Sequence, residues 1–207
     1  MGITFPKSQF HRESDPLHPH YMDKYVVEYL KSGKAWLLVG SGPSTAMGYP
    51  SWQKLAEVAA AEVATQFGED VRGLSGAMKA KDWPRVFEIG RKQLGGEKIL
   101  EVLRDSMQPS KISKIYPILA RWPVPVFLTT NYDDQIQTHL AKVGESYITY
   151  LNSEDHFGNL DSESDGAIVK IHGDLRSENG LILTQSQYSA ISEGGEWLYW
   201  RTRMTSI

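Results

Sequence analysis

The chain has 207 residues, of which 41% are hydrophobic and 23% charged, the balance of an ordinary globular protein with one large domain. A net charge of −3 with scattered basic residues gives little sign of a nucleic-acid-binding face, and no apolar run reaches the ~18 residues of a membrane span. The lack of cysteine excludes disulfides, thiolate zinc sites and a cysteine nucleophile, and it is compatible with a reducing cytoplasm, where we expect the protein. From the charge and the hydropathy, we expect neither nucleic acid nor membrane as a direct partner.

The first residues, 1–20, are polar and interrupted by proline, which predicts an irregular N-terminal arm. Apolar residues then recur at helical spacing over 21–31, and a short apolar run at 35–39 predicts a buried strand. Ser51 is placed to cap a helix over 52–66.

Residues 69–122 show helical patterns throughout, which is more than one crossover between strands needs, so we expect a helical insert over the sheet. Further elements are predicted as strands at 124–129, 147–151, 167–171 and 181–183, a helix at 134–142 and a polar loop at 152–166. Thr184 and Gln187 match a capping box that opens a final helix. Strands that alternate with helices predict an α/β fold with a doubly wound parallel sheet.

Polar segments directly follow three of the predicted strands. These segments are Gly40-Ser41-Gly42-Pro43-Ser44, Thr129-Thr130-Asn131-Tyr132-Asp133 and Ile171-His172-Gly173-Asp174. In an open α/β sheet, ligands bind at the carboxyl ends of the strands, so we expect the three segments to meet in one crevice. A glycine turn, a carboxamide, a carboxylate and an imidazole together suit cleavage or transfer chemistry on a nucleotide.

The first segment places Gly40 and Gly42 between a strand and a helix, where backbone amides can approach a pyrophosphate closely. Ser41 and Ser44 add hydroxyl groups to this turn. Thr45 stands where the dinucleotide fingerprint has its third small residue, and no Gly-Lys-Ser/Thr of a Walker loop follows. A plain strand-to-helix turn explains the two glycines equally well.

Two readings are open for the second segment. Asn131 and Asp133 could cap the helix that is predicted to follow, because both residue types are favoured caps. As site residues, Asn131 could orient a water or a ribose hydroxyl, and Asp133 could accept a hydroxyl hydrogen bond. A lone strand histidine is usually structural, but the position of His172 at the carboxyl end of its strand favours a general base.

In their chain order, these segments resemble the sirtuin-like domain of prokaryotic antiphage defence proteins. The further residues that carry the resemblance are Gly48-Tyr49-Pro50-Ser51-Trp52, Leu55, Leu183-Thr184 and Tyr188. The resemblance covers about residues 33–190 and implies a Rossmann-like domain that binds and hydrolyses NAD, with Asn131 and His172 as the catalytic residues. The residues that it implies for NAD contact are Gly40, Ser41, Gly42, Ser44, Thr130 and Asp133.

The chain departs from protein-deacetylating sirtuins in three places. It has no cysteine for their zinc module, Ser51-Trp52-Gln53 replaces an Asp-Phe-Arg motif, and Thr130 replaces a glutamine. We therefore do not expect acyl-lysine recognition, whereas the residues for NAD chemistry are retained.

The resemblance predicts an NAD glycohydrolase that breaks the ribose–nicotinamide bond and acts in antiphage defence by depleting NAD. NAD is then the substrate, and no metal is predicted, because no histidine pair has the His-x-x-x-His spacing of a helical metal site. Two alternatives are ADP-ribosyl transfer to a macromolecule and a non-catalytic module that senses NAD or ADP-ribose and oligomerises. A homo-oligomer and a sensor domain or partner protein that controls activity are also implied.

The last residues predict an apolar helix with several aromatic side chains. Its large apolar residues are Trp197, Leu198, Tyr199, Trp200 and Met204. They either complete the core of this domain or meet a missing part of the chain or a neighbouring subunit. Because the family's second glycine-serine motif is not reached before Ile207, we expect residues 21–207 to be a sirtuin-like domain in the N-terminal part of a longer protein.

Overall fold

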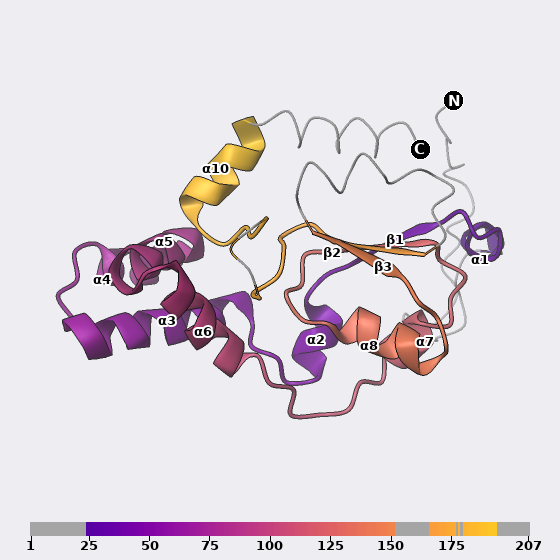
Figure 1. Ribbon diagram of the computed structural model, residues 1–207, viewed down its shortest axis with the longest axis horizontal. Coiled ribbons are helices and arrows are strands. Elements are labelled where there is room, and N and C mark those ends of the chain that lie inside the picture. Colours follow the sequence, from indigo (N-terminus) through magenta and orange to yellow (C-terminus); the bar gives the residue numbers. More distant parts are fainter. Residues whose placement is uncertain (1–23, 152–165, 177, 179, 194–207) are drawn as a thin grey trace, which may run out of the picture.

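The structure is a computed structural model that describes residues 24–151, 166–176, 178 and 180–193. The predicted arm at 1–20, nearly all of the predicted loop at 152–166 and the aromatic cluster at 197–204 lie outside the described residues. The described residues form two lobes, which we call the sheet lobe and the helical lobe (Figure 1).

The sheet lobe is built on four parallel strands in the order β1-β2-β4-β3. The strands are β1 (Trp36–Val39), β2 (Val126–Thr129), β3 (Ile148–Leu151) and β4 (Ala167–Lys170). Every residue of β2 and β4 is buried, as expected for the inner strands of a parallel sheet. The register aligns the last residues of three strands, Val39 with Thr129 and Thr129 with Lys170. The prediction that the three polar segments begin at one edge is therefore confirmed.

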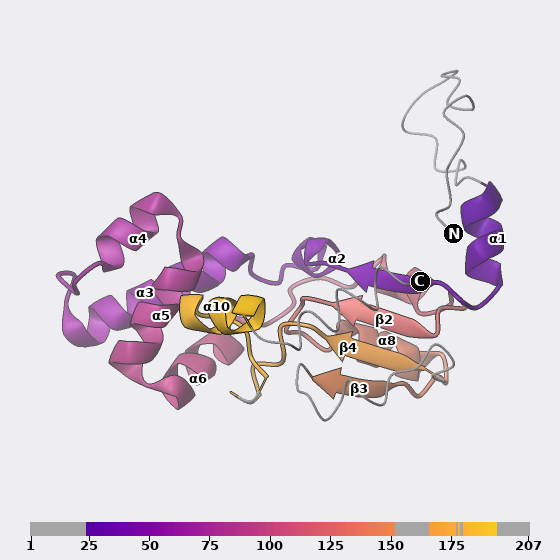
Figure 2. The ribbon, with the colours of Figure 1, turned by 90° about the horizontal axis from the view of Figure 1, so that it is seen from above.

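Three helices, α2 (Gly42–Ala46), α7 (Tyr116–Leu119) and α8 (Gln135–Lys142), lie on one face of this sheet (Figure 1). Helix α1 (Lys24–Lys31) precedes β1 at the end of the sheet away from the helical lobe (Figure 2). The buried side chains that join the sheet to these helices include Phe127, Ile168, Tyr116, Ile136 and Leu140. The predicted α/β class with a parallel sheet is confirmed.

The helical lobe contains α3 (Trp52–Phe67), α4 (Leu74–Ala80), α5 (Trp83–Leu94), α6 (Gly96–Ser106) and α10 (Gln185–Glu193). Ser51 caps α3 as predicted, because its hydroxyl accepts the amide hydrogen of Lys54 at 3.2 Å. The helical insert is confirmed, but its bounds differ from 69–122. It starts with α3, whose apolar face packs into the core of this lobe, and Tyr116 and Ala120 belong to the core of the sheet lobe.

Two predicted elements differ in the structure. The helical pattern expected to continue to residue 122 gives only the short helix α7 at its end, because the Ser113 hydroxyl accepts the amide hydrogens of Ile115 and Tyr116 and so delays the start of the helix. The strand expected at 181–183 is not formed, although its residues are buried, and Ile182 makes a single backbone hydrogen bond to the carbonyl of His172. The capping box is confirmed by reciprocal hydrogen bonds between Thr184 and Gln187.

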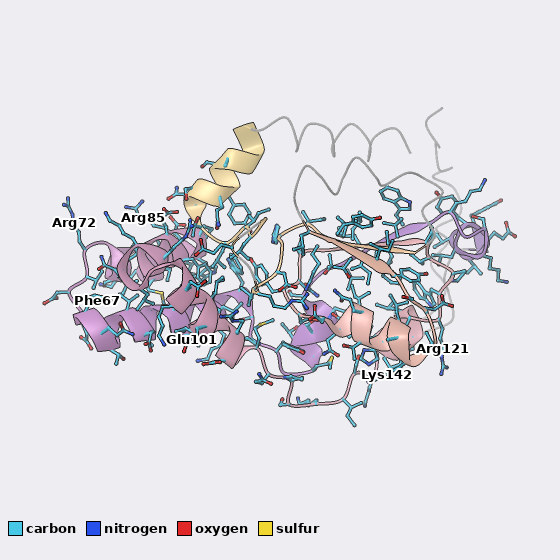
Figure 3. All side chains as sticks on the ribbon, in the orientation of Figure 1. Phe67, Arg72, Arg85, Glu101, Arg121 and Lys142 are labelled. Atoms are coloured by element: carbon cyan, nitrogen blue, oxygen red, sulfur yellow. The ribbon has the colours of Figure 1, made fainter. Side chains whose placement is uncertain are left out.

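The strand arrows point toward the helical lobe, so the carboxyl edge of the sheet faces the junction of the two lobes (Figure 2). Exposed basic side chains lie on both lobes: Arg72 and Arg85 on the helical lobe, and Arg121 and Lys142 on the sheet lobe (Figure 3). Of the helices in the described part of the chain, none is long and apolar enough to cross a membrane.

Candidate active site

A cavity of about 260 Å³ lies at the junction of the lobes. It is lined by residues from all three polar segments, namely Ser41, Ser44, Thr130, Asn131, Asp133 and His172. The helical lobe contributes Trp52, Leu55 and Tyr188. Six of the eight predicted site residues therefore meet in one cavity, while Gly40 and Gly42 do not line it.

The glycine turn has open space above it. A Cβ atom built at Gly40 or Gly42 would meet no atom of the described residues within 4 Å. The packing of the chain therefore does not require glycine at either position, whereas close approach of a phosphate group would. Helix α2 has only five residues, so any anion at this turn would depend on nearby amides more than on a helix dipole.

The Asn131 side chain is buried and its orientation is set by three acceptors. Its Nδ2 donates to the Gly40 carbonyl at 3.0 Å, and lies 3.2 Å from Ser44 Oγ and 3.3 Å from Tyr116 Oη. Because a carbonyl oxygen can only accept, the amide nitrogen must face Gly40. Asn131 Oδ1 is then the atom that remains for a ligand, and it can only accept a hydrogen bond.

Both carboxylate oxygens of Asp133 accept hydrogen bonds within the protein, and the first of these is the helix-start role that the sequence left open. Its Oδ1 accepts the amide hydrogen of Gln135 at 3.0 Å at the start of α8, and its Oδ2 accepts the Ser44 hydroxyl at 2.7 Å. Ser44 is 3% exposed and has one hydrogen, which this bond uses. Ser44 therefore links Asp133 to Asn131, and in this arrangement it has no hydrogen to donate to a phosphate.

His172 lies in an aromatic part of the cavity. Its ring is 5.6 Å from Tyr188 in an edge-on arrangement and 6.5 Å from Tyr132. Burial lowers the pKa of His172 below its ordinary value of 6.5, with no contribution from a charged group of the described residues. The imidazole is therefore neutral at pH 7 and can accept a proton.

The side chain between the two polar residues of the second segment ties the lobes together. Tyr132 stacks on Trp52 at 5.9 Å and belongs to the core of the helical lobe. Its hydroxyl donates to the carbonyl of Ile182 at 2.7 Å. Because Tyr132 is held by these contacts, the backbone of its neighbours Asn131 and Asp133 is held in position at the cavity.

A buried ion cluster holds the second and third segments together behind the cavity. The Lys170 ammonium is fully buried and donates to the Tyr132 carbonyl at 3.0 Å, to Asp134 at 2.9 Å and to Asp174 at 2.8 Å. Burial alone would raise the pKa of Asp174, but hydrogen bonds from Arg176 and Lys170 outweigh it and lower the pKa to about 2. Asp174 is therefore a structural carboxylate and does not line the cavity.

Tyr116, which contacts Asn131 and Ser44, was not among the predicted site residues. It is 72 residues away from Ser44 in the chain and sits in a stretch that reads as an ordinary helix. Its only local mark is the Ser113 turn before it, which does not distinguish a site residue from a core tyrosine.

Comparison with known families agrees with this geometry. Residues 125–205 match the SIR2-like domain family, and the matched segment includes Asn131, Asp133 and His172. This part of the chain is similar to SIR2-like domains. The predicted resemblance to sirtuin-like domains is thus confirmed.

Several curated relatives of this chain carry the names of enzymes or of defence proteins. It is 25% identical over 180 residues to the NAD(+) hydrolase ThsA of Cytobacillus dafuensis, and 25% identical over 189 residues to the protein of that name from Enterococcus faecium. It is 31% identical over 173 residues to the defense-associated sirtuin 2 of Bacillus subtilis.

These alignments cover 84%, 87% and 80% of the chain but only 34%, 37% and 16% of the respective relatives. The chain thus spans about a third of the length of the two hydrolases, and less of the third protein. Within the described residues, no group of three or more His, Asp or Glu side chains is placed to hold a metal ion.

Proposed function

We propose that this chain hydrolyses NAD at the bond between ribose and nicotinamide. The observation that carries the proposal is the placement of an oriented carboxamide, Asn131, and a neutral imidazole, His172, in one cavity at the carboxyl edge of the sheet. The SIR2-like domain match and the relatives named NAD(+) hydrolase support NAD as the substrate.

The proposed reaction needs little help for its leaving group. Nicotinamide is a cationic pyridinium in NAD, so when the N-glycosidic bond breaks it takes the bonding electron pair and leaves as a neutral molecule. The ribose carbon passes through an oxocarbenium-like state, and water adds to it. The products are nicotinamide, ADP-ribose and one proton.

Two hydrogen-bond acceptors then act on the incoming water or on a ribose hydroxyl. Asn131 Oδ1 accepts one hydrogen and so orients the oxygen, and His172 takes the proton that is released. Because Asn131 is held by three partners before the substrate arrives, little reorganisation is needed in the transition state. Thr130 and Ser41 line the cavity at the strand ends and are proposed to contact the substrate, as is the open glycine turn at Gly40 and Gly42.

We further propose a role in antiphage defence by NAD depletion, as suggested by the relative named defense-associated sirtuin. A hydrolase of this kind would harm its own cell if it were always active. Control by homo-oligomer formation or by a partner protein or sensor domain, in the cytoplasm where NAD is available, therefore belongs to the proposal.

The test is to incubate the chain with NAD labelled in its adenosine half and to separate the products. We expect free ADP-ribose and nicotinamide from the wild type. His172→Ala should lower kcat by ~10² to 10⁴, the usual effect of losing a general base. Asn131→Ala should lower kcat far more than it raises KM, because the amide acts chiefly by positioning reactants.

The other outcomes separate the alternatives. Label on a macromolecule in place of free ADP-ribose would indicate ADP-ribosyl transfer. NAD binding without any product, with or without a candidate activator, would indicate a sensing module. A folded His172→Ala variant with the wild-type rate would contradict the assignment of the base.

A further inference from the structure

A closed set of hydrogen bonds lies beneath the cavity and joins Tyr116 to the proposed catalytic amide. Tyr116 Oη is 2.6 Å from Ser44 Oγ and 3.3 Å from Asn131 Nδ2. Ser44 Oγ is in turn 2.7 Å from Asp133 Oδ2 and 3.2 Å from Asn131 Nδ2. Four side chains from three separate parts of the chain therefore meet at one point.

Counting hydrogens fixes the direction of each bond. Both Asp133 oxygens accept, one from Gln135 and one from Ser44, so the Ser44 hydrogen points to Asp133. The short Ser44–Tyr116 contact then requires the Tyr116 hydroxyl to be the donor. With their hydrogens used in this way, Ser44 Oγ and Tyr116 Oη can act toward Asn131 only as acceptors. The group of Asn131 that faces them must therefore be the NH2 group.

We propose that Tyr116 is a positioning residue, which acts through Ser44 to hold the Asn131 carboxamide with its NH2 group inward and its Oδ1 atom toward the cavity. Without this hydroxyl, Asn131 Nδ2 loses one of its three acceptors and Ser44 Oγ loses the donor on its other side, so the carboxamide is held less firmly. The catalytic consequence of this inference rests on the proposed NAD hydrolysis.

The Tyr116 side chain is itself held rigidly. It is 1% exposed, its ring stacks on His139 of α8 at 5.6 Å, and its amide donates to Ser113 Oγ at 2.9 Å. Helix α8 begins at the turn where Asp133 accepts the Gln135 amide hydrogen, so both ends of the hydrogen-bond chain are fixed to the same helix. Tyr116 Oη is therefore held in a fixed position relative to Ser44 and Asn131.

The Tyr116 hydroxyl also keeps its hydrogen under working conditions. Burial raises the pKa of Tyr116 to about 12, and the nearby negative charge of Asp133 adds to the effect. The hydroxyl is therefore a donor at every pH at which the protein would operate.

The first measurement compares Tyr116→Phe with a matched control, Tyr147→Phe. Tyr147 also packs against the core of the sheet lobe, and its hydroxyl donates to the Val124 carbonyl at 2.8 Å, but it does not line the cavity. We expect Tyr116→Phe to lower kcat about 10- to 100-fold, with KM changed less than about twofold, because the loss is one of orientation. Tyr147→Phe should keep the wild-type kcat.

The second measurement does not depend on turnover. The chain has four asparagines, Asn131, Asn152, Asn159 and Asn179, so ¹⁵N-asparagine labelling gives few side-chain NH2 signals. Comparison with Asn131→Ala assigns the signal of Asn131. We expect its NH2 hydrogens to exchange slowly with solvent in the wild type and in Tyr147→Phe, and faster in Tyr116→Phe.

These readouts separate the two hypotheses. Wild-type kcat and unchanged NH2 protection in Tyr116→Phe would overturn the positioning role, and so would equal losses in Tyr116→Phe and Tyr147→Phe. If the wild type cleaves no NAD but NH2 protection is lost in Tyr116→Phe alone, the positioning role holds and the proposed function fails. Should Tyr116→Phe not fold, Ser44→Ala must show the same loss of protection, since it breaks the same chain of hydrogen bonds.

Discussion

At the scale of single residues, His172 is suited to its proposed role by what surrounds it. Tyr188 and Tyr132 shield its ring from water, and a buried imidazolium loses the hydration that would stabilise its charge. The ring therefore starts the reaction in the neutral form and need not first lose a proton. Asn131 complements it, because the carboxamide accepts a hydrogen bond without any titration.

The pH dependence of the rate follows from this burial. The base works when it is neutral, and burial lowers its pKa, so the acidic limb of the kcat/KM profile should have its midpoint below pH 6.5. The measurement is a pH profile of kcat/KM for NAD hydrolysis, with protein stability checked at each pH.

A variant of the shielding residue serves as the control for this profile. Tyr188→Ala exposes the His172 ring to water, so the acidic limb of the profile should move up toward pH 6.5. An acidic limb above pH 6.5 in the wild type, or an identical limb in the two proteins, would contradict the shielding argument.

At the scale of elements, the turn after β4 depends on one glycine. Gly173 has φ +74°, and a Cβ atom there would collide with the backbone of Gly180 and Leu181. This close approach lets the Ile182 amide donate to the His172 carbonyl at 3.0 Å. The segment at 181–183 therefore supports His172 without forming a regular strand.

Replacing Gly173 with alanine should lower the free energy of unfolding by more than the strain of a positive φ alone. Gly144 has φ +86° with open space around its Cβ position, so Gly144→Ala should lower the free energy of unfolding by about 1–2 kcal/mol. Gly173→Ala adds a backbone collision and should cost a further ~1–3 kcal/mol. Urea unfolding of both variants measures the difference, and equal losses would mean that the 180–181 segment moves away freely.

Much of this element-level arrangement could be predicted from the sequence. Apolar runs located the parallel strands, and six of the eight site residues predicted from the polar segments after them line the cavity, because both signals are local. The strand expected at 181–183 could not be excluded, since buried irregular segments carry the same apolar pattern. Tyr116 could not be found, because its role depends on a contact across 72 residues.

At the scale of the whole molecule, the cavity exists because two lobes meet. Its floor is the carboxyl edge of the sheet, and part of its wall is Tyr188 on α10. Helix α10 is held to α5 by Glu88, whose Oε2 accepts the Ser186 amide hydrogen at 3.1 Å and the Ser186 hydroxyl at 2.8 Å. Burial raises the pKa of Glu88, but these hydrogen bonds outweigh it and lower the pKa, so the carboxylate is charged at neutral pH.

Loss of the hydrogen bonds between Glu88 and Ser186 should therefore weaken substrate binding without changing the rate of the chemical step. In Glu88→Ala, α10 loses two hydrogen bonds at its start, and we expect KM for NAD to rise about fivefold, the equivalent of ~1 kcal/mol, with kcat nearly unchanged. Glu101→Ala is the matched control, because Glu101 lies on the same lobe, in α6, and pairs only with Lys98 among the described residues (Figure 3).

Steady-state kinetics of NAD hydrolysis by both variants measure the two KM values. A rise in KM that is equal in both would point to the loss of negative charge, and no rise in Glu88→Ala would show that α10 keeps its place in the cavity wall by apolar packing on α5.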